Sequence, residues 1–185
     1  DTLYCDEVSS KKRKACTNLL GLILDMLLKW FAPILSFTTE EVFQIINHGN
    51  NSSIHLQDFP KIPNSWKNEQ LYKKWESFRK IRKVVNAGIE EKRAKKEIGS
   101  SLEADVVIYL NEDYLKIVND FDLSENFITS KAEAKKMLND DSLFKLDEVE
   151  NIKVLVKKAD GKKCPRCWKI FIDKCKRCQS VEKSS

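Results

Sequence analysis

The C-terminal end of the chain carries two Cys-x-x-Cys pairs separated by seven residues. The two pairs are Cys164-Pro165-Arg166-Cys167 and Cys175-Lys176-Arg177-Cys178. Each pair can direct two thiolates at one ion from a tight turn, and tetrahedral Zn²⁺ takes four such ligands at about 2.3 Å. The connector is long enough to bring the second pair to the other side of the ion. The pattern therefore predicts one structural zinc site, whose closed shell leaves no open position for catalysis.

Two disulfides or a set of reactive thiols are the alternatives for these cysteines. The chain has six cysteines in 185 residues and no signal-peptide pattern, so it lacks the cysteine density of small secreted domains. A reducing compartment, and hence a metal site, is the favoured interpretation. Cys5 and Cys16 lie in a different sequence context, and we expect them to be ordinary, partly buried cysteines.

The basic residues gather in the same cysteine-bearing tail. Residues 157–185 contain ten lysines and arginines against three acids, a charge of +7. The whole chain carries +5, so residues 1–156 carry −2. Four thiolates and one Zn²⁺ would leave the tail at about +5. A small basic zinc module of this kind is typical of nucleic-acid binding.

Candidate nucleic-acid contacts follow from this charge. Trp168 directly after the first cysteine pair is the candidate for stacking on an unpaired base; the alternative is that it packs over the cysteine pairs as a small core. The segment 11–14 and the basic face of residues 71–99 are either further contacts or solvated helix surface. The candidates for phosphate contact are Lys162, Lys163, Arg166, Lys169, Lys176 and Arg177.

The sequence pattern predicts three helices in the first hundred residues. Apolar residues recur with the helical period over residues 9–32. Thr38 and Glu41 have the spacing of a capping box for a second helix that runs to about residue 47. A third helix is expected over residues 68–96. Its predicted buried stripe is Leu71, Trp75, Phe78, Ile81, Val85 and Ile89.

A helical core and no membrane span are expected for this part. The apolar stretch 19–37 is interrupted by Asp25, Lys29 and Pro33, which favours a helix with a wide buried face. The bulk of the helical core is expected from Trp30, Phe31, Phe37, Phe43, Trp75 and Phe78.

The second half of the chain reads as a small α/β module. Residues 104–110 and 152–156 are predicted strands, and Asn111 is a predicted cap for a short helix to about residue 121. Residues 127–129 are a candidate second strand, and residues 131–139 are ambiguous, with helical propensity but little hydrophobic stripe.

The fold class is therefore mainly α. We expect a helical domain at 1–97, a small α/β connecting module at 98–159 and a zinc-finger module at 160–185. His48 and His55 flank a polar loop without cysteines or paired carboxylates nearby, so we expect plain loop histidines. The sequence shows no Gly-rich phosphate loop and no nucleophile–base pattern, so no catalytic residue is predicted.

Four segments resemble one family, in the family's own order. Trp30–Glu41 resembles the Ala-Pro-Ile-Leu-x-Phe-Thr-x-Glu-Glu signature in the anticodon-binding domain of class I aminoacyl-tRNA synthetases of the Ile/Val/Leu/Met group. His55–Pro60 and Lys96–Ala104 are similar to the segments that follow it. Lys162–Trp168 resembles the C-terminal zinc finger of bacterial isoleucyl-tRNA synthetases, which favours that branch of the group.

The resemblance implies that this chain is the C-terminal portion of an ATP-dependent enzyme that attaches isoleucine to its tRNA. The parent would be monomeric and cytoplasmic. Its nucleotide-binding signatures and editing domain are not in this chain, so the chain alone is expected to bind and position the anticodon arm without catalysis. By the same likeness, the zinc ligands are Cys164, Cys167, Cys175 and Cys178.

Two other functions remain open from the sequence. The connector between the cysteine pairs is shorter than in many bacterial relatives, and this type of finger also resembles that of the formamidopyrimidine-DNA glycosylases. A stand-alone DNA- or RNA-binding zinc protein is therefore one alternative. A protein-interaction module with structural zinc is another. The order of the four matched segments favours the synthetase.

Overall fold

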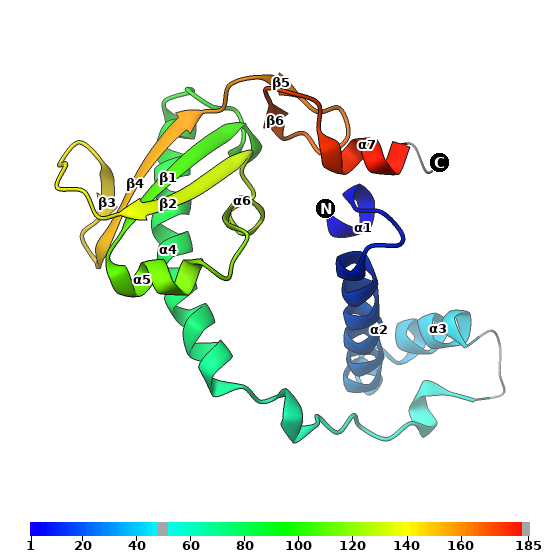
Figure 1. Ribbon diagram of the computed structural model, residues 1–185. Coiled ribbons are helices and arrows are strands. Elements are labelled where there is room, and N and C mark those ends of the chain that lie inside the picture. Colours follow the sequence, from blue (N-terminus) through cyan, green and yellow to red (C-terminus); the bar gives the residue numbers. More distant parts are fainter. Residues whose placement is uncertain (48–51, 183–185) are drawn as a thin grey trace. The chain divides into compact units, whose positions relative to one another are not determined.

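The computed structural model describes residues 1–47 and 52–182 (Figure 1). Its described part contains seven α-helices, a four-stranded sheet and a two-stranded hairpin. The mainly α fold with a small α/β module is confirmed. The predicted loop that contains His48 lies largely outside the described residues. The described residues form two compact units: one contains those of Asp1–Lys67 together with residues 180–182, and the other is Asn68–Gln179.

The first unit is helical. Ser10 caps its longest helix by accepting a hydrogen bond from the Arg13 N–H at 3.1 Å, which confirms the helix expected over residues 9–32. The elements of this unit are α1 (Thr2–Cys5), α2 (Lys11–Phe31), α3 (Ser36–Ile46) and the 3₁₀ turns η1 (Ile54–Leu56) and η2 (Asn64–Trp66).

The predicted capping box of α3 is wrong. The helix begins two residues before Thr38, and its N-cap is Leu35, which has no side-chain cap. The Thr39 hydroxyl instead donates to the Leu35 carbonyl at 2.9 Å. Glu41 therefore lies within the helix rather than at its third position, and the start of α3 is set by backbone hydrogen bonding to the preceding turn.

Glu40 joins α3 to η1. Its carboxylate accepts hydrogen bonds from Gln44 Nε2 at 2.8 Å, from the Ser53 hydroxyl at 2.8 Å and from the Ile54 N–H at 2.9 Å. These bonds lower the pKa of Glu40, with the Gln44 side chain the largest cause and the Ile54 N–H next. The Thr-Thr-Glu-Glu segment and the segment that leads into His55 are thus held together by one side chain.

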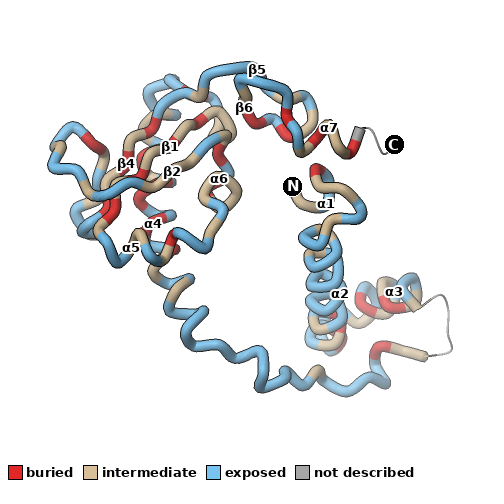
Figure 2. The backbone as a smooth tube through the Cα atoms, in the orientation of Figure 1, coloured by how far each residue is buried: buried red, intermediate tan, exposed pale blue. Residues whose placement is uncertain are grey.

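The core of the first unit is small. It contains Leu28, Ala32, Phe43 and Ile54, with Val42 packed against it. Of the six aromatic residues expected in the helical core, Phe43 and Phe78 are buried, and the prediction is wrong at the other four. Trp30, Phe31 and Trp75 are exposed, and Phe37 is 93% exposed. The main contacts of α2 among the described residues of this unit are with α1, α3 and η1, so most of the surface of α2 is exposed (Figure 2).

The second unit is a two-layer α/β structure. Its sheet has the order β2-β1-β4-β3, in which β1 pairs parallel with β2 and antiparallel with β4. Helix α4 lies along one face of the sheet (Figure 1). The elements are α4 (Glu69–Ala94), η3 (Ser101–Glu103), β1 (Ala104–Leu110), α5 (Glu112–Val118), α6 (Leu123–Asn126), β2 (Lys131–Lys136), β3 (Phe144–Leu146) and β4 (Val149–Lys158).

Alternate residues of the strands face α4 and form the main core. Val106, Ile108 and Leu110 of β1 are buried, as are Ile152, Val154 and Val156 of β4. The stripe predicted for α4 is confirmed at Phe78, Ile81, Val85 and Ile89. It is wrong at Leu71, which is 48% exposed, and at Trp75, which is at the surface but packs its ring edge-on against Phe78 and Phe121. These two residues precede the part of α4 that the sheet covers.

The strand predictions are partly confirmed. The strand over 104–110 is confirmed, and that over 152–156 is longer than expected. The strand expected at 127–129 is wrong, because Phe127 closes α6 and Ile128 has a left-handed φ of 57°. The ambiguous stretch forms β2 instead, in which Ala132 and Ala134 turn to the core and lysines to solvent.

The cap at Asn111 is confirmed, since its side chain accepts the Tyr114 N–H at 3.0 Å. Helix α5 ends at Val118, before the predicted residue 121. Among the described residues, no helix has the length and apolar character needed to cross a membrane. The three-domain division at residues 97 and 159 stays a prediction.

Candidate metal centre and nucleic-acid interface

A short hairpin follows β4 and carries the first cysteine pair in its turn. Strand β5 (Lys162–Lys163) pairs with β6 (Ile170–Phe171), and the Cys164 N–H donates to the Lys169 carbonyl at 2.9 Å. Gly161 enters the hairpin with a φ of +126°, and a Cβ there would lie 2.2 Å from the Phe171 carbonyl oxygen. Only glycine fits this position without moving the hairpin.

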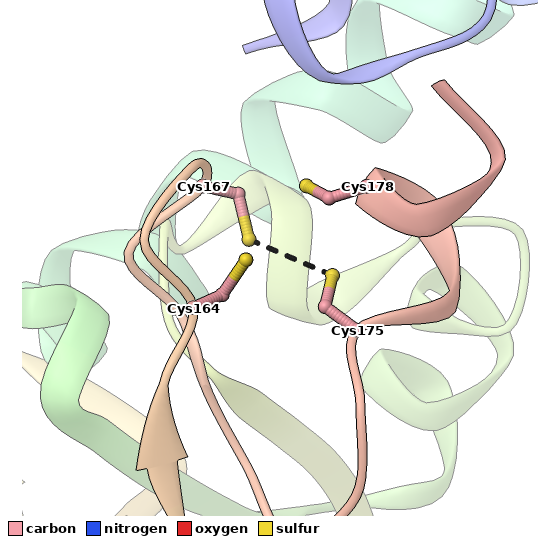
Figure 3. Close-up of side chains that lie close together, drawn as sticks. All are labelled: Cys164, Cys167, Cys175 and Cys178. Atoms are coloured by element: carbon pink, nitrogen blue, oxygen red, sulfur yellow. Dashed lines mark hydrogen bonds between the residues drawn. The ribbon is translucent and has the colours of Figure 1, made fainter. Parts of the chain in front are cut away.

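The second cysteine pair leads into α7 (Lys176–Glu182), and the four thiols converge. Their Sγ atoms all lie within 4.8 Å of one another (Figure 3), and Cys167 Sγ is 3.8 Å from Cys175 Sγ. Bonds of about 2.3 Å at tetrahedral angles place two sulfur ligands about 3.8 Å apart. All four are free thiols, and Cys167, Cys175 and Cys178 are buried while Cys164 is half-buried. The cluster can hold a metal ion.

The cluster distributes its protons unevenly. Burial acts to raise the pKa of Cys164, but the N–H groups of Cys167 and Arg166 and two neighbouring thiols lower it to about 7. Burial raises the pKa of Cys167 to about 11 and also raises that of Cys178. A divalent cation binds thiolates, so it must displace protons from the more basic members of the set.

Two side chains attach the hairpin to the sheet. Lys169 is only 8% exposed, and its ammonium group lies 3.3 Å from the Ser124 carbonyl oxygen and 3.4 Å from the Ser124 hydroxyl. Its pKa is lowered by burial. The Ser130 hydroxyl accepts the Ile170 N–H and donates to the Leu102 carbonyl. The cysteine-bearing hairpin is therefore anchored to α6 by Lys169 and to the residue before β2 by Ile170.

Glu103 supports the same junction from the Lys96–Ala104 segment. Its carboxylate accepts the Gly99 N–H at 3.0 Å, and its carbonyl accepts the Ala159 N–H at 2.7 Å. The turn after α4 is thereby joined to the end of β4, from which the hairpin emerges.

The residues predicted to contact nucleic acid differ in how far their side chains are exposed. Trp168 has a φ of 64° and is 58% exposed, with the Lys163 ammonium 5.7 Å from its ring centroid. An exposed indole does not form a small core over the cysteines. Lys169 faces Ser124 rather than solvent. Among the other candidates, the exposed residues are Lys162, Lys163 and Lys176. The half-buried residues are Arg166 and Arg177.

Sequence reasoning missed Ser124 and Ser130. Ser124 lies in the short helix α6 and Ser130 in the bend before β2, and their partners are 45 and 40 residues away along the chain. No local pattern distinguishes such serines from solvated ones, because the contact exists only when the hairpin folds back on the sheet.

Comparison with known proteins identifies the fold's family. Residues 1–108 match the anticodon-binding domain of tRNA ligase. The chain belongs to this family. The chain is 48% identical over 177 residues to an isoleucine--tRNA ligase of Pelagibacter ubique, and the similarity covers 96% of the chain and 18% of that protein.

Two further relatives bear the same name. The isoleucine--tRNA ligase of Bradyrhizobium diazoefficiens is 45% identical over 171 residues, with 92% of this chain and 17% of that protein covered. That of Rhodopseudomonas palustris is 41% identical over 175 residues, again with 92% and 17% covered. The chain thus spans less than a fifth of the length of these curated relatives, and the similarity extends well beyond residue 108.

Proposed function

We propose that this chain is the part of an isoleucine--tRNA ligase that binds the anticodon arm of isoleucine tRNA, with one structural Zn²⁺ in its cysteine cluster. The observation that carries the proposal is the convergence of four thiols beside an exposed tryptophan and exposed lysines. The family match and the names of the relatives support it. The parent enzyme would use isoleucine and ATP and act as a cytoplasmic monomer.

The cysteine cluster fixes the shape of the RNA-binding surface. Cys164, Cys167, Cys175 and Cys178 are the proposed ligands. Bound Zn²⁺ would cross-link the two cysteine pairs, and the four thiolates would complete its tetrahedral coordination shell. The connector between the pairs carries Trp168, so closing the cluster holds that indole in its exposed, left-handed backbone position.

Phosphate and base contacts are divided among the neighbouring side chains. Lys162, Lys163, Lys176 and the two arginines, Arg166 and Arg177, neutralise phosphates, which makes binding salt-dependent. Trp168 stacks on an unpaired loop base, as recognition of single-stranded RNA requires. Lys169 acts differently. Its buried ammonium holds β6 against α6, so it positions the surface without touching RNA.

The test is a titration of the zinc-loaded chain with isoleucine tRNA and with a non-cognate tRNA at two salt concentrations. We expect cognate preference, weaker binding at the higher salt, and loss of affinity in Cys164→Ser. Cys16→Ser is the matched control, because Cys16 lies outside the cluster.

Equal affinity for both tRNAs would reduce the tail to a general phosphate-binding patch. Absence of tRNA binding in the zinc-loaded chain would refute the proposal and favour a protein partner. Preference for duplex DNA over tRNA would favour the glycosylase-type finger.

A further inference from the structure

A cleft of about 620 Å³ lies between the sheet and the cysteine-bearing hairpin. One side is formed by the first residues of β1 and β2, and the other by β6 and the segment that leads to the second cysteine pair. All of these residues belong to the second compact unit, Asn68–Gln179. The volume falls within the range of roughly 300–1,000 Å³ that is usual for small-molecule sites.

The hairpin side of the cleft is apolar. Ile170 and Phe171 are half-buried, and Ile172 is 84% exposed, all three in consecutive positions. An exposed isoleucine is unremarkable alone, but here it continues an apolar wall that is already partly buried. Such a wall suits the flat face of a nucleobase, which binds apolar surface without regard to base identity.

The sheet side of the cleft presents an unsatisfied acceptor. Asp105 lies on the face of β1 opposite the core, since the alternate residues Ala104 and Val106 are buried. Its Oδ1 atom is buried and has no hydrogen-bond partner among the residues that the structure describes. Its Oδ2 atom is 3.7 Å from the Lys131 ammonium. The Asp105 side chain as a whole is 30% exposed, so its carboxylate can accept a hydrogen bond from a donor on a ligand in the cleft.

Basic side chains also line the cleft. Lys131, Lys174 and Lys176 are exposed at the cleft, and Arg177 also lines it. Three acids line it as well, namely Asp105, Asp160 and Asp173. Because the charges nearly balance, the cleft is poorly suited to a bare polyanion. It suits a ligand that carries both a phosphate and hydrogen-bond donors.

We propose that this cleft binds one unpaired nucleotide of the RNA, and that Asp105 reads its base. The base lies against Ile170 and Ile172, an amino group on the base edge donates to the Asp105 carboxylate, and the phosphate is neutralised by Lys131 and Lys174. Carboxylates are suited to reading amino groups of bases. This inference rests on the proposed function and adds to it a base-specific contact away from Trp168.

The test combines removal of the Asp105 carboxylate from the protein with removal of single amino groups from the RNA bases. The probe is a hairpin with the sequence of the isoleucine-tRNA anticodon arm, bound to the zinc-loaded chain. In a series of hairpins, each loop adenosine, guanosine or cytidine is replaced in turn by purine riboside, inosine or 2-pyrimidinone riboside, which lack the amino group. Each hairpin is titrated against the wild type, Asp105→Leu and Asp105→Ala.

We expect one amino-group deletion to weaken wild-type binding by about tenfold and to have no effect in Asp105→Leu. Asp105→Leu should weaken binding of the unmodified hairpin by the same factor. Asp105→Ala also removes the acceptor and is smaller than leucine, so it provides the test if the leucine variant does not fold. Asp141→Asn is the charge-matched control, because the Asp141 side chain is fully exposed and does not line the cleft.

Two outcomes separate this inference from the proposed function. If the wild type binds the hairpin but every amino-group deletion acts equally on wild type and Asp105 variants, the reading of a base by Asp105 is refuted and anticodon-arm binding stands. If the wild type does not bind the hairpin, both proposals fall.

Discussion

Replacing Ser130 by alanine should release the cysteine-bearing hairpin from the sheet. The Ser130 hydroxyl accepts the Ile170 N–H and donates to the Leu102 carbonyl, so one oxygen joins β6 to the turn before β1. Alanine removes both bonds and leaves a partly buried N–H without its partner. Since one hydrogen bond contributes about 0.5–1.5 kcal/mol net, the two together stabilise the closed arrangement by about 2 kcal/mol.

Amide hydrogen exchange of the zinc-loaded chain measures this opening directly. A loss of about 2 kcal/mol raises the open population about 30-fold, so the Ile170 amide should exchange about 30-fold faster in Ser130→Ala. Ser130→Thr retains the hydroxyl and should restore most of the protection. The Ile108 amide in the centre of the sheet is the internal control, because its protection from exchange is lost only when the unit unfolds.

The reasoning would be refuted by unchanged exchange at Ile170 in Ser130→Ala. It would also be refuted by equal acceleration at Ile170 and Ile108, since that result would mean that the whole unit, and not the hairpin junction, is destabilised.

Three further predictions concern the rest of the chain. Phe78→Ala should lower the free energy of unfolding by about 3–5 kcal/mol, because Phe78 is 1% exposed and stacked on Phe121 at 4.2 Å; denaturant unfolding checks this, and a loss below about 1 kcal/mol would contradict it. Gly161→Ala should weaken zinc retention in a chelator competition, because its Cβ would lie 2.2 Å from a carbonyl oxygen and its φ of +126° alone costs about 1–3 kcal/mol; unchanged retention would contradict it. The pKa of Glu40 is lowered in the fold, so its stabilising contribution is complete above about pH 4.3, the usual glutamate value, and is lost as the pH falls below it. Carboxyl NMR titration should find this pKa below 4.3, and Glu40→Gln should abolish that part of the acid sensitivity.

The sequence was most informative where local pattern decides structure. The cap at Asn111, the strand over 104–110 and the spacing of the cysteine pairs depend on neighbours within a few residues, and the structure has each of them. Periodicity also found the part of the α4 stripe that the sheet covers.

Packing between distant segments was not predictable in the same way. Trp30 and Phe31 are apolar residues at helical spacing in α2, yet both are exposed, because periodicity shows which face of α2 is apolar and not whether another element of the chain covers it. Lys169 shows the opposite case. Its place in a basic tail suggested a phosphate contact, whereas the fold of β6 turns it inward to Ser124.

The order of the strands in the sheet has a consequence for synthesis of the chain. The family match ends at residue 108, inside β1, and the antiparallel partner of β1 is β4, which ends at Lys158. During translation, the apolar stripe of α4 therefore remains uncovered until about fifty more residues have been added. Such long-range closure is slow and leaves apolar surface open to aggregation. A chain cut at the family boundary would keep that surface exposed permanently.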